Sequence, residues 1–230
     1  MSFRRYDLYI QEEILLLALK DDKGTFYMRS ILPALGGAIA AELLLSGKIE
    51  VEENRKKMVN VISRQTFGDP LLDEALNKIA TAKRRASLQT WIRRFSHLPK
   101  LQHRIAQGLC RKSVLRQDEK QLLLFFRQKI YPELDHGAEE HLIGRLHDAI
   151  FGESNEIEPR TVVLMALAKA TDLLSIPFPR KELSSRKKRI KSIVEGDLIG
   201  TATKEAIEAV QAALAVAAMV PIMAASASST

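Results

Sequence analysis

With 230 residues, 46% of them hydrophobic, the chain can bury the core of one domain, and this composition excludes an intrinsically disordered protein. Its 35 Lys and Arg residues exceed its 28 Asp and Glu residues, and the formal net charge of +7 favours anionic partners, either phospholipid or nucleic acid. The single cysteine, Cys110, excludes an internal disulfide and is expected to be a half-buried packing residue.

The first part of the chain predicts two helices and a short strand. One helix begins near Gln11 and contains a solid apolar run. The next is predicted over residues 30–46, because apolar residues recur at helical spacing and Pro33 suits a first turn. Gly47 is expected to end this helix, and the alternating residues 48–52 predict a strand after it.

The middle of the chain predicts three more helices. One opens at Asp69-Pro70, one spans residues 87–95 around the only tryptophan, and one spans residues 98–112. The short segment Ser113-Val114-Leu115, the mostly charged residues 116–120 and a following apolar run then predict a β-hairpin with a charged tip.

The second strand of this hairpin contains five consecutive large apolar residues. Because side chains alternate along a strand, the block divides into two sets: Leu122, Leu124 and Phe126, and Leu123 and Phe125. A strand that is apolar on both faces needs cover on both faces. We expect one set to pack on the helical body and the other to contact a second copy of the chain or a membrane, with burial in the core as the alternative.

The last third predicts helices over residues 134–151, 159–174 and the basic residues 180–194, and a final helix from about Thr203. The apolar tract 206–225 consists mostly of Ala and Val. Alanine is too weakly apolar to hold a bilayer span, so the tract predicts a buried packing helix and not an anchor.

Together these elements predict a mainly α fold, a compact single-domain helical bundle with one protruding β-hairpin and short strand pieces. The domain is expected to cover residues 8–222. Residues 1–7 are expected to form a flexible N-terminal arm, and residues 223–230 a flexible Ala/Ser tail.

Residue patterns for catalysis or metal binding are missing from the sequence. Gly36-Gly37 lies inside a predicted helix without the lysine of a phosphate-binding loop, which favours close helix packing. Asp135-His136 has no serine or cysteine nucleophile motif beside it, and Glu140 and His147 have no third ligand at metal spacing. We therefore expect no enzymatic activity, no metal and no cofactor.

Basic residues gather in clusters whose common sign favours an anionic partner. The clusters are Arg4-Arg5, then Lys83-Arg84-Arg85 with Arg93-Arg94, and Arg180-Lys181 with residues 186–189 and Lys191. Each cluster alone is also what a solvated surface shows. The predicted helix 98–112 followed by a hairpin is also the order of a winged helix, so a nucleic-acid-binding module is an alternative. Nucleic acid is the less favoured partner, because no set of stacking aromatics is visible. An oligomeric structural protein without a lipid ligand is a further alternative.

An ordered series of segments resembles the Golgi phosphoprotein 3 family from about residue 8 to residue 220. The matching segments are residues 12–21, 35–37, 42–45, 47–49, 71–76, 91–92, 104–109, 112–115, 123–125, 160–167 and 170–174. The resemblance implies a compact helical protein whose protruding hairpin contributes to self-association and membrane contact. It also implies an adaptor that binds phosphatidylinositol 4-phosphate on the cytosolic face of Golgi membranes and retains glycosyltransferases there. We expect a minimal or bacterial member.

The resemblance also indicates where a lipid head group would bind. The aromatic position of the family falls at Tyr27, whereas its three basic positions fall at Gly36, Pro99 and Gln102, none of which is basic. The specific pocket is therefore expected to be degraded, with anionic head groups held by a basic face. The residues expected to supply this site are Tyr27, Lys100, His103 and Arg104.

Overall fold

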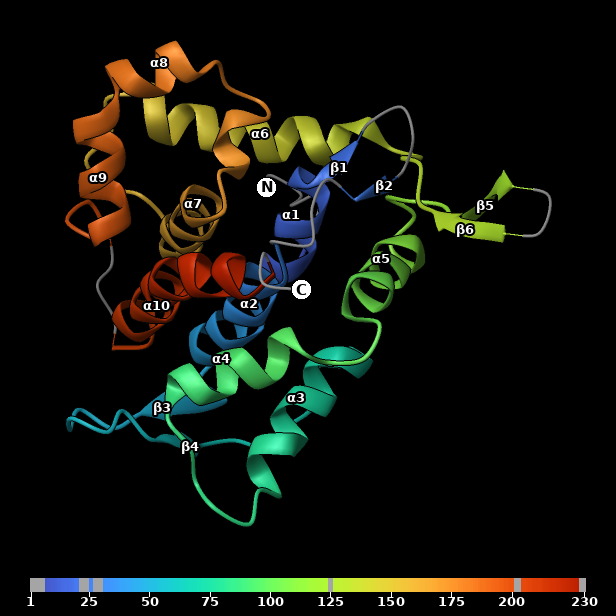
Figure 1. The fold of residues 1–230 in the computed structure, drawn as a ribbon. Helices are drawn as coiled ribbons and strands as arrows, with labels where there is room; N and C mark the ends of the chain where they lie inside the picture. Colours follow the sequence, from blue (N-terminus) through green and yellow to red (C-terminus); the bar gives the residue numbers. More distant parts are fainter. Residues whose placement is uncertain (1–6, 21–24, 27–30, 124–125, 201–203, 228–230) are drawn as a thin grey trace.

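The computed structural model describes residues 7–20, 25–26, 31–123, 126–200 and 204–227. The fold is mainly helical with small antiparallel strand pairs, which confirms the predicted fold class (Figure 1). The helices of the described residues are α1 (Ile10–Leu17), α2 (Leu32–Leu45), α3 (Pro70–Ala80), α4 (Leu88–Ser96), α5 (Leu101–Arg111), α6 (His136–Phe151), α7 (Pro159–Ala170), α8 (Arg180–Ser185), α9 (Lys187–Glu195) and α10 (Lys204–Ala227), with a 3-10 turn, η2 (Leu173–Ser175), after α7.

The strands form three separate antiparallel pairs within the described residues. The pairs are β1 (Leu19–Lys20) with β2 (Thr25–Phe26), β3 (Ile49–Val51) with β4 (Val59–Val61), and β5 (Asp118–Leu123) with β6 (Phe126–Ile130). The β5–β6 hairpin projects from the helical body beyond α5 (Figure 1).

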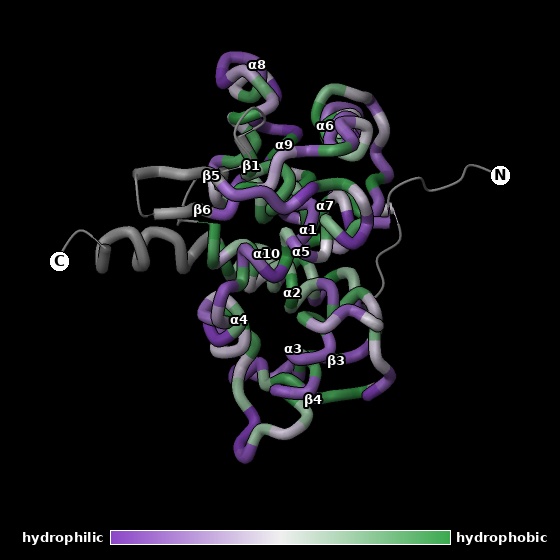
Figure 2. The backbone as a smooth tube through the Cα atoms, turned by 90° about the vertical axis from the view of Figure 1, so that its right-hand side faces the viewer, coloured by the Kyte–Doolittle hydropathy of each residue, from purple (hydrophilic) through white to green (hydrophobic). Residues whose placement is uncertain are grey.

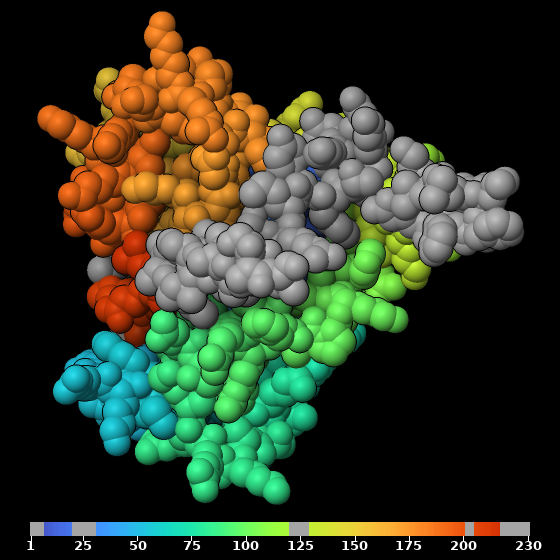
Figure 3. All heavy atoms as spheres, in the orientation of Figure 1, coloured from blue at the N-terminus to red at the C-terminus, as the bar shows by residue number. Residues whose placement is uncertain are grey.

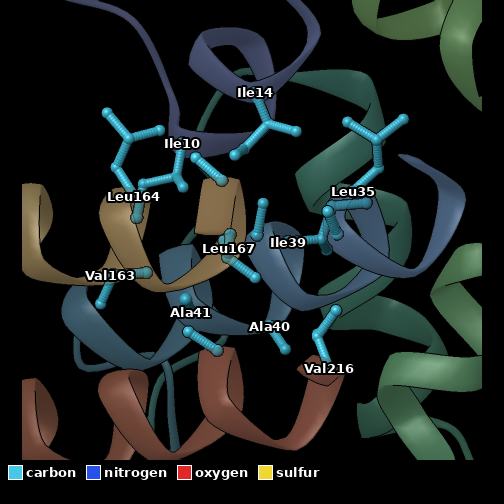
Figure 4. Packing of buried hydrophobic residues seen from close by; sticks show 14 of the residues in the cluster. Ile10, Ile14, Leu35, Ile39, Ala40, Ala41, Val163, Leu164, Leu167 and Val216 are labelled. Carbon is cyan, nitrogen blue, oxygen red and sulfur yellow. The ribbon is translucent and has the colours of Figure 1, made fainter. Parts of the chain in front are cut away.

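Helix α2 is the centre of the core. Its sequence is apolar on all sides, which is typical of a helix enclosed by other helices, and residues 33–44 are all buried. Helices α1, α4, α7 and α10 pack around it (Figure 4). Two glycines allow this close packing: a Cβ atom on Gly36 would lie 2.3 Å from Ser96 Oγ on α4, and one on Gly37 would lie 2.4 Å from Val216 Cγ2 on α10. The packing interpretation of the glycine pair is confirmed.

Side-chain caps fix where several helices begin. Asp69 accepts hydrogen bonds from the backbone N–H groups of Leu71 and Leu72, both at 3.0 Å, and so satisfies two donors that α3 leaves unpaired. Asp135 accepts one from Gly137 N at 3.0 Å, which starts α6 at His136 and not at the expected Leu134.

Three further helix boundaries differ from the predicted ones. Helix α5 begins at Leu101, because Lys100 has φ of 54° and cannot continue a right-handed helix from residue 98. Helix α7 ends at Ala170, since Asp172 has φ of 58° and turns the chain into η2. The basic stretch 180–194 forms two helices, α8 and α9, which meet at Arg186.

The predicted hairpin exists, but its predicted strands and charged tip are wrong. The charged residues Asp118–Lys120 belong to strand β5, and the register pairs Asp118 with Ile130 and Leu123 with Phe126. Leu122 and Leu123 end β5 whereas Phe126 begins β6, so the predicted alternation of the two sets along one strand is also wrong. Of the block, Leu124 and Phe125 are outside the described residues.

The expected first strand, residues 113–115, is used to close α5 instead. Ser113 has φ of 60° at the end of that helix, and the buried Val114 donates its N–H to Leu109 O at 3.0 Å. Val114 O then accepts from Leu134 N at 2.9 Å, which anchors the base of the hairpin to the start of α6.

Two other predictions concern the ends of the chain. Residues 1–6, in the expected arm, and residues 228–230, in the expected tail, lie outside the described residues. Helix α10 continues through Pro221 to Ala227, and its buried residues up to Val216 pack into the core as predicted. In the part of the chain that the structure describes, no helix combines the length and apolarity that crossing a bilayer requires.

Candidate anion-binding surface

A basic group lies where α5 begins, next to the base of the hairpin. Lys100 is exposed and immediately precedes the helix, and His103 Nδ1 lies 3.2 Å from the Tyr131 hydroxyl oxygen. Partial burial lowers the pKa of His103, and the nearby charges of Lys129 and Lys100 lower it further. The imidazole ring of His103 is therefore partly desolvated and lies near two positive charges. Tyr27, the aromatic member of the expected site, lies outside the described residues.

Arg104, the other expected site residue, is engaged by a carboxylate. Its Nη2 donates to Glu74 Oε2 on α3 at 2.5 Å, and the same glutamate lies 3.5 Å from the Lys78 ammonium. A phosphate would have to compete with Glu74 for this guanidinium. Lys100, by contrast, forms no ion pair with any other described residue.

The three positions that are basic in the family have different environments here. Gly36 is buried where α2 meets α4, and a Cβ atom there would lie 2.5 Å from Ile92 O as well as against Ser96. No side chain fits without moving α4. Pro99 is exposed and Gln102 half-buried, both beside the start of α5.

A hollow of about 790 Å³ opens between α3 and α4 and reaches Pro99. Its lining includes four Lys and Arg side chains together with His97, and contains no Asp or Glu. These residues come from the end of α3, the α3–α4 connection and α4, and they are Lys78, Lys83, Arg84 and Arg94. The sequence predicted basic clusters here, but not that Arg94 joins Lys83 and Arg84 around one concavity.

Neighbouring groups fix the geometry of this hollow. The Arg94 guanidinium stacks over the Trp91 ring, 4.5 Å from its centre, so its position is restrained. The indole Nε1 of Trp91 is buried and has no hydrogen-bond acceptor among the described residues. Arg85 is held by Glu52 and Asn60 in the β3–β4 region. Of the three consecutive basic residues 83–85, Lys83 and Arg84 therefore line the hollow and Arg85 does not.

Three buried carboxylates elsewhere are paired with cations. Glu12 accepts from Lys112 Nζ at 2.6 Å and Glu13 from Arg145 Nη2 at 2.6 Å. Glu42 binds Arg160 through both of its oxygens. Burial raises the pKa of all three carboxyl groups, that of Glu42 to about 7. Among the described side chains, no group of three or more His, Cys, Asp or Glu residues is arranged to hold a metal ion.

The fold and this surface define a mainly helical single-domain protein with a basic concave face and a projecting hairpin. The family model described as Golgi phosphoprotein 3 (GPP34) matches residues 10–210, and the chain belongs to this family. The resemblance read from the sequence is thereby confirmed.

The chain is also similar to a curated relative, vacuolar protein sorting-associated protein 74 of Schizosaccharomyces pombe (strain 972 / ATCC 24843). The two are 28% identical over 222 residues, which cover 82% of this chain and 65% of the relative. The chain therefore spans slightly less than two thirds of that relative's length.

Proposed function

We propose that this protein is a non-enzymatic peripheral membrane protein that binds anionic lipid head groups through the hollow between α3 and α4 and the adjoining start of α5. The observation that carries the proposal is the lining of the hollow, which contains four Lys and Arg side chains and no Asp or Glu; one of the four, Lys78, is paired with Glu74 outside the lining. Each Lys or Arg near an anionic membrane contributes roughly 1 kcal/mol of binding energy. Family membership favours phosphatidylinositol 4-phosphate as the head group and the cytosolic face of the Golgi as the location in a eukaryotic cell.

The geometry supports a relocated phosphate site. The buried Gly36 leaves no room for an arginine at the family position. Arg94, by contrast, is restrained on Trp91, and the basic side chains of Lys83 and Arg84 line the same hollow. Charge-assisted hydrogen bonds from Arg and Lys are the interactions that hold a phosphate monoester. Lys100 would add charge at the rim, where Pro99 reaches the hollow.

Vesicle sedimentation tests the proposal. Wild-type protein should pellet with phosphatidylcholine vesicles that contain phosphatidylserine or phosphatidylinositol 4-phosphate, and not with phosphatidylcholine alone. The variant K83Q/R84Q should bind about 30-fold more weakly at low salt, since it removes two charges. The charge-matched control K181Q/K188Q, on α8 and α9, should bind like wild type.

Two results would contradict this function. Equal pelleting on neutral and anionic vesicles would remove the electrostatic basis. A salt-dependent shift of random duplex DNA that K83Q/R84Q abolishes, without vesicle binding, would favour the nucleic-acid alternative.

We also propose that the tip of the β5–β6 hairpin contacts either the membrane or a second copy of the chain. Leu122 and Leu123 end β5 and Phe126 begins β6, in a hairpin that projects from the helical body (Figure 1). Apolar residues on a projecting element are typical of a membrane or protein contact. The variant L123S/F125S should remain folded by circular dichroism. A smaller mass by light scattering would identify a copy–copy contact, and an unchanged mass with weaker vesicle binding would identify a membrane contact. Unfolding would show instead that the block is core.

A further inference from the structure

The basic stretch that forms α8 and α9 divides into two sets with different roles. Arg189 donates to Ala149 O at 2.8 Å and to Ser154 O at 2.6 Å, and Arg186 donates to Phe151 O at 3.4 Å. These arginines satisfy carbonyl groups at the end of α6 and attach α9 to it. Two charges of the cluster, those of Arg186 and Arg189, therefore have a structural role.

The second set lines a hollow of about 360 Å³ between α7, α8 and α9. Lys187 and Lys191 are four residues apart and share one face of α9. Arg180 enters from α8 and Lys169 from the end of α7, so the charges converge from separate elements.

The hollow has an excess of positive charge. Its four basic side chains face one carboxylate, Asp172, which gives the lining a net charge of +3. Asp172 lies 2.5 Å from Arg180 in an exposed pair, which contributes little stability and can exchange partners. Lys191 lies 3.7 Å from Glu195, which is outside the lining, and Lys187 makes no ion pair with any other described residue. An anion in the hollow would relieve the mutual repulsion of these cations.

The floor of the same hollow is apolar. It includes the buried Leu174 and Ile190 and the half-buried Leu183. The volume lies near the lower end of small-molecule sites, which run from roughly 300 to 1,000 Å³, so a small ligand fits better than a folded partner. We propose that this hollow binds a small amphipathic anion, in which a carboxylate or phosphate head contacts the cations and a short aliphatic tail lies on the apolar floor.

This site is separate from the proposed membrane surface. Helices α8 and α9 form one end of the molecule and α3 and α4 the other, in the space-filling view as in the side view (Figures 2 and 3). The proposal therefore stands whether or not the α3–α4 hollow binds lipid, and K83Q/R84Q should leave it unchanged.

Titration calorimetry with octanoate and octyl phosphate, both below their micelle-forming concentrations, tests the site. Each should bind once per chain, with acetate and inorganic phosphate at least about tenfold weaker because they lack the tail. Octyltrimethylammonium, which has the same tail and the opposite charge, should not compete. The variant K187Q/K191Q should lose about tenfold or more in affinity, whereas K181Q/K188Q, with the same loss of charge divided between α8 and α9, should bind like wild type.

The apolar half of the site is tested by L183N, with a thermal unfolding curve as the folding control. This variant should bind octanoate and acetate with affinities that differ less than in wild type. If octanoate binds K187Q/K191Q as tightly as K181Q/K188Q, or if octyltrimethylammonium competes equally, the site does not exist. Preference for an acidic peptide over octanoate would overturn the proposal in favour of a protein partner.

The same variants distinguish the source of the anion. If K187Q/K191Q loses both octanoate binding and part of its binding to anionic vesicles, the ligand is drawn from the membrane. If it loses octanoate binding alone, the ligand is a free metabolite-sized anion. Either result supports the hollow as an amphipathic-anion site.

Discussion

Arg160 on α7 binds Glu42 on α2 with both terminal guanidinium nitrogens, each 2.8 Å from a different carboxylate oxygen. The same carboxylate accepts the backbone N–H of Ile10 at 2.9 Å, so α1, α2 and α7 meet at one buried side chain. Such two-point pairing is the strongest geometry that an arginine and a carboxylate can adopt. The pair therefore fixes the relative positions of three core helices.

Breaking this pair should destabilise the protein strongly. In R160M the Glu42 carboxylate stays buried without its cation, and the free energy of unfolding should fall by roughly 3–5 kcal/mol. The matched control is R180M, which breaks an exposed pair with Asp172 and should change stability by less than about 1 kcal/mol. Urea unfolding curves of the two variants give both values, and equal losses would contradict the difference in burial.

Stability should depend on pH through Glu42. Burial raises the pKa of this carboxyl group to about 7 from 4.5, with the Arg160 charge opposing the rise. The folded protein therefore holds this proton more tightly than the unfolded chain, so the contribution of Glu42 to the free energy of unfolding decreases as pH rises from about 4.5 to 7. Urea unfolding at a series of pH values should show a steeper decline for wild type than for E42Q. Parallel curves would mean that Glu42 titrates normally.

The two glycine contacts of α2 can be tested against a free helical glycine. In G36A the new methyl group would overlap Ser96 Oγ and Ile92 O, and such overpacking costs roughly 1–3 kcal/mol. Gly144 on α6 has no atom within 4 Å of its would-be Cβ, so G144A should be neutral or stabilise the helix by up to about 1 kcal/mol. Thermal unfolding measures both. A tolerated G36A would show that α4 moves easily, and would reopen Gly36 as a place for a head-group cation.

The basic group at the start of α5 should respond to single charge changes. Because the positive charge of Lys100 helps to lower the pKa of His103, K100Q should raise that pKa. The distant K181Q should leave it unchanged. The imidazole proton shifts of His103 in an NMR pH titration report the effect. An identical titration of wild type and K100Q would place Lys100 too far away to share an anion with the histidine.

Local pattern was sufficient for most helices of this fold. The apolar spacing around Leu35 and Ile39, and the cap residue Asp69, lie within the elements they specify. The hairpin was misassigned because both its apolar segments and the charged residues between them suit a hairpin locally. Val114 and Leu115 pack into the core, and this packing decides that residues 113–115 close α5 and do not form a strand of the hairpin. Such a tertiary contact cannot be read from the local sequence pattern.

The two hollows illustrate a stronger limit on prediction from sequence. The clusters around Lys83 and Lys187 were visible as runs of charge, but runs do not show which side chains face inward. Arg186 and Arg189 are consumed by carbonyl groups of α6, some 35 to 40 residues away, while Lys169 joins the second hollow from another helix. Only the tertiary contacts separate structural charges from those that line a hollow.

The position of α10 has a consequence for biosynthesis. During translation the central helix α2 emerges early, whereas the residues that cover its Gly37 side, including Val216, follow nearly 180 positions later. Until then the nascent chain displays one flank of an almost wholly apolar helix, the kind of surface that chaperones bind. The core around α2 is therefore completed only after α10 has been synthesised, and a ribosome-stalled chain without α10 should remain bound to chaperones.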